Sequence, residues 1–545
     1  MEHTMTHFLT LFEEVTRKYW NEDALSNFQG KTYTYAQMAE EIARLHRLFA
    51  ELGIKPGDKI AVCGRNSAEW AIAFLAANAY HAVAVPLLAN FTAESITRLC
   101  NHAECAMLLV DGKIFRSGVQ PDQVPTLKVV MNLDNAACLY SSDETYAQAC
   151  KRLAAPLPAP LTPNDIHYAS DDLEELCIIS YTSGTTGNPK GIMLPSRAIS
   201  ANIDFAQRMI PSSPRVKSLS MLPLAHMFGF VFEFLYPFLG GAHIVFLGKM
   251  PTPSILMQAF AEVKPYLFIT VPLVMEKLIK GKVMPVLRKP AMRVGLALPF
   301  TSRLIYRYLN KKLTKALGGN VVLIPMGGAA ISQPVERLLR KIGLPFTVGY
   351  GMTECAPLVG YTGWETFVPG SCGRCIDTLE MRIDSIRPDK VVGEIQVRGT
   401  NVMLGYYKDP EATKAAFTDD GWMHTGDLGI IDKHGNIFLK GRSKCMILTS
   451  NGQNIYPEEI ESRLNDMPHI AESLVVDRDH ALVALVALHP EDAELSLDEL
   501  EAIAADTRKN INRVLPSYSQ INKVEILKNG FEHTPKNSIK RNLYS

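Results

Sequence analysis

The sequence predicts an α/β protein with a large N-terminal domain of parallel sheets, a small β-ribbon or barrel subdomain, and a small α+β C-terminal domain. At 545 residues the chain exceeds what one hydrophobic core usually organises. Strand-like and helix-like segments alternate between residues 59 and 351, which is typical of parallel sheets covered by helices. From about Val391 onward, short alternating segments punctuated by glycine indicate antiparallel ribbons.

The individual elements follow from hydrophobic periodicity. Residues 59–88 predict a βαβ unit: an apolar strand, a helix beginning near Ser67, and a second strand ending at Val85 and Pro86. The same alternation recurs at residues 218–239 and 321–351. The apolar run 228–248 is long enough to span a bilayer but contains Glu233 and Pro237, so we expect a buried helix followed by a buried strand. We place the domain boundary between residues 443 and 444, giving domains 1–443 and 444–545.

The composition and the N-terminal sequence argue against a disordered, a nucleic-acid-binding or a secreted protein. Hydrophobic residues make up 47% and charged residues 21%, which is the balance of a folded globular protein. The 56 Lys and Arg residues equal the 56 Asp and Glu residues, so no overall basic field attracts nucleic acid. The N-terminus lacks the pattern of a signal peptide, and the ten cysteines are scattered as reduced core residues are. We therefore expect a cytoplasmic protein, and no feature indicates an oligomeric state.

The segment "YTSGTTGNPKGIML", residues 181–194, has the composition of a phosphate-binding loop. Glycines let backbone N–H groups approach phosphate oxygens, hydroxyls add donors, and Lys190 supplies charge. It is not a Walker A motif, because that motif requires Ser or Thr after the lysine and here Gly191 follows. Taken alone, the segment could also be an ordinary turn between strands.

Three further motifs remove that ambiguity. "GYGMTECAP" (349–357), "GWMHTGD" (421–427) and "GRSKCMILTSNGQNIYPEEIE" (441–461) follow the loop in an order and spacing that resemble the adenylate-forming superfamily. That superfamily comprises acyl-CoA synthetases, peptide-synthetase adenylation domains and luciferases, and the resemblance runs from residue 32 to residue 544. It implies a mobile C-terminal domain and a reaction in which ATP activates a carboxylate as acyl-AMP before a thiol accepts the acyl group.

The resemblance implies a set of ATP contacts. Glu354 and Thr185 would hold Mg²⁺, a hard cation that prefers oxygen ligands. Tyr350 would stack on adenine, and Asp427 with Arg442 would bind the ribose hydroxyls, although a core aromatic and a surface ion pair are the structural alternatives. The remaining expected contacts are Thr182, Ser183, Gly184, Thr185, Thr186, Gly187 and Lys190 on the phosphates, Thr353 near the phosphate, Gly351 beside it, and Gly328 and Ala329 on the other face of the purine.

The C-terminal domain contributes the remaining groups that the resemblance implies. Family members carry a lysine near the C-terminus that reaches the α-phosphate, and "TPKNSIKRNLY" (534–544) offers Lys540, with Lys536 as the alternative because the motif departs from the family pattern. A solvated tail lysine is the structural alternative. Lys444 occupies the hinge position, and Gly452 and Asn454 belong to the face presented to CoA in the second step.

The acyl pocket is predicted to be apolar. His226 in "LPLAHMFGF" resembles the family position that borders this pocket, although a core histidine is the simpler interpretation of a lone His. Apolar residues dominate the neighbouring segment, and no acidic residue is placed to bind the ammonium of an amino acid. We therefore predict a long-chain-fatty-acid–CoA ligase that uses ATP, Mg²⁺ and CoA. The alternatives are a ligase that loads a carrier-protein thiol and a non-catalytic nucleotide or lipid sensor.

Residues 276–315 have a strong local charge asymmetry, with eleven Lys and Arg residues against the single acid Glu276. Apolar residues interleave the basic ones, and the segment resembles an insertion of long-chain acyl-CoA synthetases. Such a pattern suits peripheral contact with an anionic membrane, which would be the inner face of the cell membrane. The structural alternative is a solvated helix whose apolar side packs inward. No nucleic-acid-binding module accompanies the segment.

Overall fold

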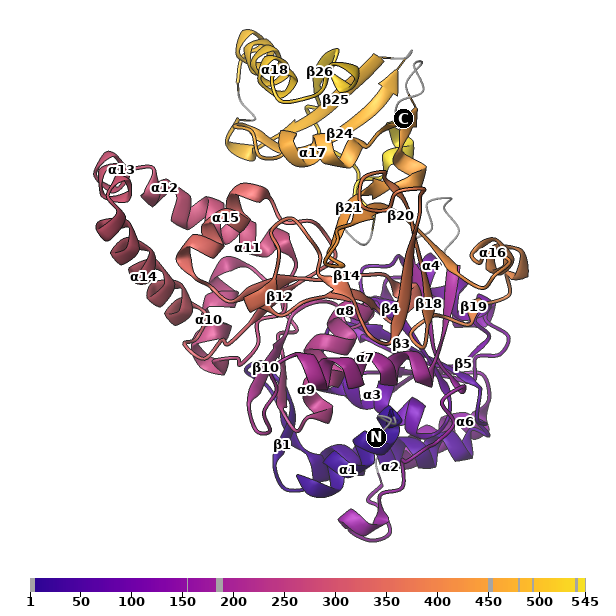
Figure 1. Cartoon of the computed structure of the whole chain (residues 1–545). Coiled ribbons are helices and arrows are strands. Elements are labelled where there is room, and N and C mark those ends of the chain that lie inside the picture. The colour runs from indigo at the N-terminus through magenta and orange to yellow at the C-terminus, as the bar shows by residue number, and fades with distance from the viewer. Residues whose placement is uncertain are drawn as a thin grey trace.

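The computed structural model describes residues 5–153, 155–182, 190–448, 454–478, 481–492, 495–534 and 538–544. A large N-terminal body lies below a separate C-terminal domain, and a helical hairpin projects from the side of the body (Figure 1). This arrangement confirms the predicted fold class, while the exact boundary at residue 443 stays a prediction.

An eight-stranded sheet organises the N-terminal body. Its strand order is β19, β9, β8, β4, β3, β5, β6, β7. The predicted βαβ unit is present, and the hydroxyl of Ser67 caps its helix by accepting from the backbone N–H of Trp70. The strands are β3 (Lys59–Gly64), β4 (Val83–Leu88), β5 (Cys105–Val110), β6 (Val129–Asn132), β7 (Cys138–Ser141), β8 (Leu176–Thr182), β9 (Lys190–Pro195) and β19 (Gly405–Tyr406).

The sheet is mixed rather than wholly parallel. Strands β8, β4, β3, β5 and β6 are parallel, whereas β9 returns antiparallel to β8 and β7 antiparallel to β6. A parallel return needs a crossover of a dozen or more residues, and residues 183–189 are too few to provide one. The phosphate-loop segment therefore joins two neighbouring antiparallel strands.

Smaller sheets complete the N-terminal body. One has the order β10, β11, β1, β2, another pairs β12 with β13 in parallel, and a third has the order β14, β15, β16. The strands are β1 (Asp23–Asn27), β2 (Thr32–Thr34), β10 (Lys217–Ser220), β11 (His243–Phe246), β12 (Ile324–Met326), β13 (Phe346–Val348), β14 (Tyr350–Gly351), β15 (Leu358–Tyr361) and β16 (Arg374–Cys375).

Antiparallel ribbons follow, as predicted from the glycine-punctuated segments. A four-stranded sheet has the order β17, β18, β20, β21, with every neighbouring pair antiparallel. Its strands are β17 (Leu379–Asp384), β18 (Gly393–Gly399), β20 (Met423–Ile431) and β21 (Ile437–Arg442). The last residue of this sheet, Arg442, leads directly into the C-terminal domain (Figure 1).

Helices cover the sheets and contribute aromatic side chains to the core. The rings of Phe74 and Phe230, for example, lie 4.5 Å apart between centroids. The helices of the body are α1 (Phe8–Lys18), α2 (Tyr35–Glu51), α3 (Ala68–Ala79), α4 (Ala93–His102), α5 (Gly112–Arg116), α6 (Glu144–Leu153), α7 (Ser196–Met209), α8 (Met227–Gly229), α9 (Tyr236–Leu239), α10 (Pro253–Val263), α11 (Pro272–Leu278), α12 (Met284–Leu287), α13 (Pro290–Ala297), α14 (Pro299–Ala316), α15 (Gln333–Ile342) and α16 (Pro410–Ala415).

The apolar run 228–248 lies inside the protein, as predicted. A π-helical turn, Phe230–Leu235, joins α8 to α9, and β11 follows with all four residues buried. Among the described residues, no helix combines the length and apolar character needed to cross a bilayer.

The C-terminal domain has its own core. Strand β24 (Ile470–Arg478) pairs antiparallel with β25 (Ala481–Leu488), which pairs in parallel with β26 (Lys523–Ile526). Helices α17 (Pro457–Leu464) and α18 (Leu497–Asn512) pack against this sheet, and β22 (Ile447–Leu448) pairs with β23 (Asn454–Ile455). Away from the connection between the domains, the ammonium of Lys280 contacts the carboxylate of Asp466 at 2.9 Å.

Candidate active site

The phosphate-loop segment connects the ends of β8 and β9, where Thr182 and Lys190 are paired across the two strands. Ser183, Gly184, Thr185, Thr186 and Gly187 lie outside the described residues, so their expected contacts stay predictions. The ammonium of Lys190 lies 4.5 Å from the centroid of the Tyr406 ring. This cation–π contact fixes the charged end of Lys190 beside the edge strand β19.

Tyr406 connects the phosphate loop to the expected metal ligand. Its hydroxyl lies 3.3 Å from the Glu354 carboxylate, and the backbone N–H of Met403 donates to the carbonyl of Glu354. Burial raises the pKa of the Tyr406 hydroxyl, and the Glu354 carboxylate raises it further, so Tyr406 remains a neutral hydrogen-bond donor. The structure therefore brings Lys190 and Glu354, distant in sequence, to one place through Tyr406.

Sequence reasoning missed Tyr406. The available signal was the glycine before two tyrosines in "LGYYKD", since a glycine in a strand often marks a close approach of another part of the chain. Gly405 has a positive φ of 142°, and a Cβ at that position would lie 2.6 Å from the Thr413 side chain. Only glycine fits there, and it lets β19 pair with β9 so that Tyr406 faces Lys190.

Asp427 is the centre of a second group. It accepts a hydrogen bond from the Tyr350 hydroxyl at 2.7 Å through one oxygen, and its other oxygen pairs with Nε of Arg442 at 2.7 Å. Asp427 and Arg442 are cross-strand neighbours in β20 and β21. Burial raises the pKa of the Asp427 carboxyl, and the Arg442 guanidinium opposes that shift.

The pair of Asp427 and Arg442 lies at the edge of the core. Asp427 is only 6% exposed, whereas the side chain of Arg442 is 58% exposed, so the ribose role of the pair stays a prediction. A buried carboxylate is costly unless it is paired and hydrogen-bonded, and both conditions hold here. Tyr350 is 5% exposed and its hydroxyl binds Asp427, which makes it a core aromatic as well as a candidate adenine contact.

The glycine motif at residues 327–329 lies beside the Tyr350 strand. The backbone N–H of Gly349 donates to the carbonyl of Met326, and a Cβ on Gly327 would lie 3.2 Å from the Phe228 ring. Gly328 and Ala329 are exposed next to this contact, and their place beside the purine stays a prediction. Gly351 is also exposed, and Thr353 is half-buried at the start of the turn that holds Glu354.

His226 is the N-cap residue of α8 and is half-buried at the end of the loop 221–226. The loop is fixed by Glu233, whose carboxylate accepts from the backbone N–H groups of Met221 and Leu222 at 2.9 and 2.8 Å. Glu233 is fully buried, and burial raises the pKa of its carboxyl well above the usual range. The sequence singled out Glu233 only as an interruption of the apolar run, and its anchoring role depends on the π-helical turn.

The C-terminal residues stand apart from these groups. Among the described residues, the ammonium of Lys540 contacts Glu532 of its own domain at 3.2 Å and not the motif residues of the body. Lys444 is exposed in a turn, Ser443–Cys445, directly after Arg442, and Asn454 is exposed and pairs with Leu448. Gly452 and Lys536 lie outside the described residues.

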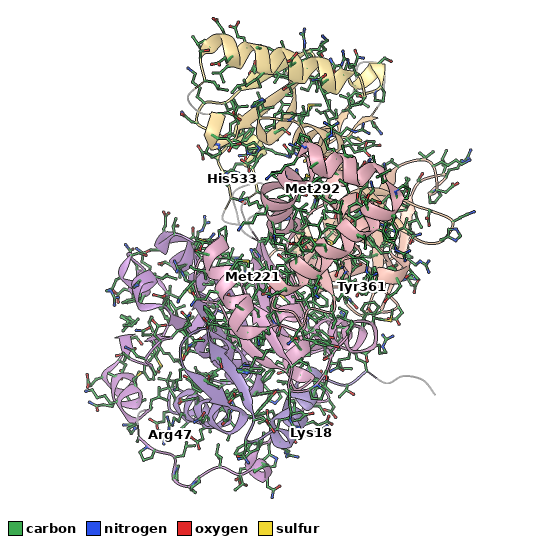
Figure 2. All side chains as sticks on the ribbon, turned by 90° about the vertical axis from the view of Figure 1, so that its left-hand side faces the viewer. Lys18, Arg47, Met221, Met292, Tyr361 and His533 are labelled. Atoms are coloured by element: carbon green, nitrogen blue, oxygen red, sulfur yellow. The ribbon has the colours of Figure 1, made fainter. Side chains whose placement is uncertain are left out.

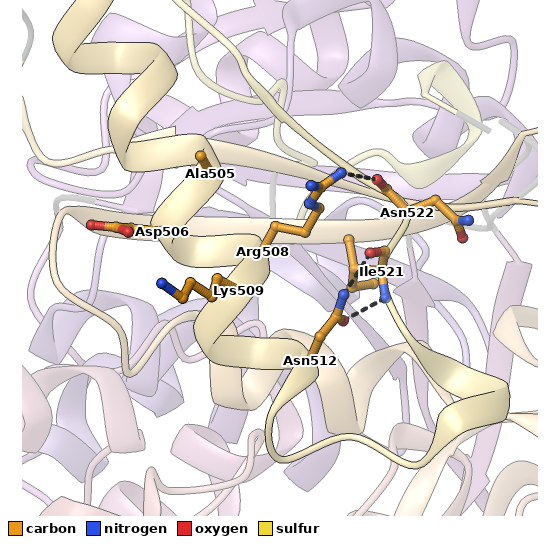
Figure 3. Close-up of a pocket in the computed structure, with 7 residues that line it drawn as sticks. All are labelled: Ala505, Asp506, Arg508, Lys509, Asn512, Ile521 and Asn522. Atoms are coloured by element: carbon orange, nitrogen blue, oxygen red, sulfur yellow. Dashed lines mark hydrogen bonds between the residues drawn. The ribbon is translucent and has the colours of Figure 1, made fainter.

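A pocket of about 670 Å³ lies elsewhere, on the C-terminal domain between α18 and β26 (Figure 3). Its polar groups bind one another: Arg508 donates to the carbonyl of Asn522, and the Asn512 side chain forms two hydrogen bonds with the backbone of Ile521. None of the motif residues lines this pocket. Its hydrogen bonds connect the helix to the sheet, which is a structural role.

Comparison with known families agrees with this geometry. Residues 12–407 match the AMP-binding enzyme family, and residues 444–545 match the C-terminal domain of AMP-binding enzymes. The chain belongs to the AMP-binding enzyme family. The matched segments contain the Lys190, Tyr406 and Glu354 group and the C-terminal Lys540, which confirms the resemblance inferred from the motifs.

Relatives in this family match most of the chain. The chain is 28% identical to the long-chain-fatty-acid–CoA ligase ACSBG2 of Rattus norvegicus over 533 residues, covering 90% of this chain and 78% of that protein. It is 29% identical to the long-chain-fatty-acid–CoA ligase FadD15 of Mycobacterium tuberculosis over 486 residues, covering 85% and 78%.

Solved structures of AMP-binding enzymes have the same fold. ATP-bound MatB from Rhodopseudomonas palustris superposes with a TM-score of 0.76 at 22% identity, covering 97% of this chain and 98% of MatB. The anthranilate CoA ligase AuaEII, in complex with anthranoyl-AMP, superposes with a TM-score of 0.79 at 18% identity, covering 99% and 97%.

Proposed function

We propose that the protein is an ATP- and Mg²⁺-dependent acyl-CoA ligase for medium- or long-chain fatty acids. The observation that supports this most is the convergence of two groups: Lys190 with Tyr406 and Glu354, and Tyr350 with Asp427 and Arg442. The first suits a polyphosphate with its metal ion, and the second suits a ribose. Relatives named as long-chain-fatty-acid–CoA ligases support the same reaction.

The first step requires charge stabilisation more than a nucleophile. The fatty-acid carboxylate attacks the α-phosphorus of ATP, the bond to the β-phosphate oxygen breaks, and pyrophosphate leaves with acyl-AMP as the product. Negative charge accumulates on phosphoryl oxygens, which Lys190 offsets directly. The carboxylate of Glu354 and the hydroxyl of Thr185 are oxygen donors of the kind that a hard cation prefers, and Mg²⁺ held by them would neutralise phosphate charge.

Asp427 orients the nucleotide. A carboxylate can accept two sugar O–H groups, and the two contacts that Asp427 already makes fix its position in advance. Lys540 would supply the remaining cation at the α-phosphate. Because its ammonium here contacts Glu532, this role requires the C-terminal domain to bring Lys540 toward the body.

The region around His226 favours an apolar acid. Phe228 and Phe232 lie 5.8 Å apart between ring centroids, and Phe230, Phe232 and Phe234 are buried. The one acid in this segment, Glu233, uses its carboxylate on the backbone of residues 221 and 222 and is not placed to bind a substrate ammonium. An amino-acid substrate would lack a counter-charge here, whereas an alkyl chain would not need one.

The second step transfers the acyl group to a thiol. The thiol of CoA attacks the acyl carbon, the bond to the phosphate oxygen breaks, and AMP leaves. Lys444, which follows the last strand of the body by two residues, would be the hinge for a rotation that presents Asn454 and Gly452 to CoA. A carrier-protein thiol is the alternative acceptor.

The test is ATP–pyrophosphate exchange with purified protein and a series of acids from acetate to stearate, together with benzoate and leucine. We expect exchange that increases with chain length and is absent with leucine. Exchange with leucine or benzoate alone would contradict the proposed substrate class. Binding of ATP with no exchange for any acid would identify a nucleotide sensor.

A further inference from the structure

Residues 284–308 form most of a helical hairpin that projects from the body. It consists of α12, α13 and the first half of α14, and Figure 2 turns this side toward the viewer, with Met292 on α13. The two longer helices contact each other where Gly295 faces Ile305, since a Cβ on Gly295 would lie 3.0 Å from the Ile305 side chain. We call residues 284–308 the hairpin tip.

The hairpin tip has no core of its own. None of the residues from 284 to 308 is buried, whereas Val283 before it and Leu309 after it both are. The base of the hairpin is attached firmly, because Ile279, Val283, Leu309 and Leu313 belong to the apolar core of the body. Met284, Leu287, Ile305 and Tyr306 of the tip pack against this core but stay partly exposed. The rest of the tip lacks the packing of an apolar face that usually stabilises helical segments of this length.

Large apolar side chains cover the hairpin tip. Phe300 is 76% exposed, Val294 68% and Tyr308 64%, and Val286, Leu298 and Leu304 are also exposed. Exposed apolar patches of this kind mark interaction sites on otherwise soluble folds. The inward-packing alternative therefore fails for these exposed tip residues, whereas it holds for Ile279, Val283, Leu309 and Leu313 at the base.

The hairpin tip is also purely cationic. It contains Arg288, Lys289, Arg293, Arg303 and Arg307 and no Asp or Glu. None of these five forms an ion pair with any residue that the structure describes. By contrast, Lys280 at the base pairs with Asp466 and Glu276.

We propose that the hairpin tip docks on the surface of an anionic lipid bilayer, with its apolar side chains inserted at the level of the headgroups. Unpaired cations complement anionic headgroups, and the apolar side chains between them need an apolar phase, which a bilayer supplies and a nucleic acid does not. Docking requires neither ATP nor CoA, so the inference goes beyond the ligase reaction and can fail independently of it.

The test is co-sedimentation of the full-length protein with vesicles of phosphatidylcholine alone and of phosphatidylcholine with phosphatidylglycerol. We expect binding to the anionic vesicles only, and binding that weakens as salt is added because exposed charges are screened. Binding to neither kind of vesicle would overturn the proposal.

A charge variant tests the contribution of the cations. Each basic residue near an anionic membrane strengthens binding to that membrane about fivefold. A triple variant that combines Arg293→Gln, Arg303→Gln and Arg307→Gln should therefore bind anionic vesicles about 100-fold more weakly. The matched control is Lys151→Gln with Lys433→Gln and Lys528→Gln, three exposed lysines on other surfaces, which should change binding less than twofold. Equal losses in both triple variants would show only that total charge matters and would overturn the assignment to the hairpin tip.

An apolar variant tests insertion. Phe300→Ser should weaken binding to anionic vesicles at least about tenfold, and this loss should persist at high salt because it does not depend on charge. Ile386→Ser is the matched control, since Ile386 is 91% exposed on the loop between β17 and β18. All variants should keep the thermal unfolding midpoint of the wild type, because every substituted side chain is exposed.

Two further outcomes would overturn the proposal. If Phe300→Ser binds vesicles as the wild type does, the apolar side chains do not insert. If the wild type fails to bind vesicles but self-associates in size-exclusion chromatography, and Phe300→Ser abolishes the association, the tip is an interface between two copies of the chain.

Discussion

The hydroxyl of Tyr350 donates a hydrogen bond to Asp427, 2.7 Å away, and Arg442 pairs with the other oxygen of the same carboxylate. Three motifs that are separate in the sequence therefore meet at one buried carboxylate. This carboxylate is the group that we propose accepts the ribose hydroxyls of ATP, and the loop that holds Lys190 and the turn that holds Glu354 meet at Tyr406.

Asp427→Asn should weaken ATP binding selectively. The change keeps the shape of the side chain but removes the charge that strengthens its hydrogen bonds, and such bonds contribute about 1.5 to 3 kcal/mol. We expect the KM for ATP to rise about 10- to 100-fold in pyrophosphate exchange, with the KM for the fatty acid nearly unchanged. Asp420→Asn is the control, because Asp420 is an exposed carboxylate paired with Arg382. Equal effects of both substitutions would contradict the ribose role.

Lys540→Ala should separate the two half-reactions. Loss of a cation at the α-phosphate should slow acyl-AMP formation at least about 100-fold, while CoA thioester formation from supplied acyl-AMP stays within a few fold. The measurement is single-turnover kinetics of each step, with Lys528→Ala as the control. If Lys536→Ala rather than Lys540→Ala gives this pattern, the catalytic lysine is Lys536. Equal losses in both steps would mean that neither assignment holds.

Lys444→Pro should block the second step. Proline fixes φ near −65°, so a hinge residue that changes its backbone angles between the two steps would be held in one state. Acyl-AMP should still form, and its conversion to acyl-CoA should fall about 100-fold because the reacting groups are misplaced. Lys444→Ala keeps backbone freedom and should retain both steps. Normal thioester turnover in the proline variant would show that the hinge lies elsewhere.

Glu233→Gln should change how stability depends on pH. Burial raises the pKa of the Glu233 carboxyl, so the folded wild type holds a proton that the unfolded chain releases above about pH 4.3. The contribution of protonated Glu233 to the free energy of unfolding is therefore fully present below that pH. It is lost as the pH rises toward the pKa of Glu233 in the folded protein, by about 1.4 kcal/mol per pH unit. Glutamine can still accept the two backbone hydrogen bonds but does not titrate. The unfolding midpoint of the variant should rise relative to wild type between pH 5 and 7, and parallel profiles would contradict this account.

The roles of the site residues stay predictions, but part of their arrangement could be read from the sequence. The family motifs indicated the turn with Thr353 and Glu354 and the pair of Asp427 and Arg442, whose side chains lie together in the structure. They did not reveal that Tyr406 joins Lys190 to Glu354, because that contact depends on the pairing of β19 with β9, which are more than 200 residues apart in the chain.

Burial was the least predictable property. Asp427 has the same side chain as the exposed Asp420 in the same motif region, yet only the structure distinguishes them. The basic segment 276–315 was predicted as a helix with two possible environments, and its periodicity suits both. The choice between them depends on whether another element covers Phe300 and Val294, and a local pattern contains no information about that.

The most direct test of the central proposal is mass spectrometry of the complete reaction, with purified protein, ATP, Mg²⁺, CoA and palmitate, beside the Lys540→Ala variant. The account predicts AMP and palmitoyl-CoA in equal amounts with the wild type, and neither in excess of background with the variant. Formation of pyrophosphate and palmitoyl-AMP without palmitoyl-CoA, followed by transfer of the palmitoyl group to the thiol of an added carrier protein with release of AMP, would contradict CoA as the acceptor. Absence of AMP with palmitate and with shorter acids would contradict the ligase itself.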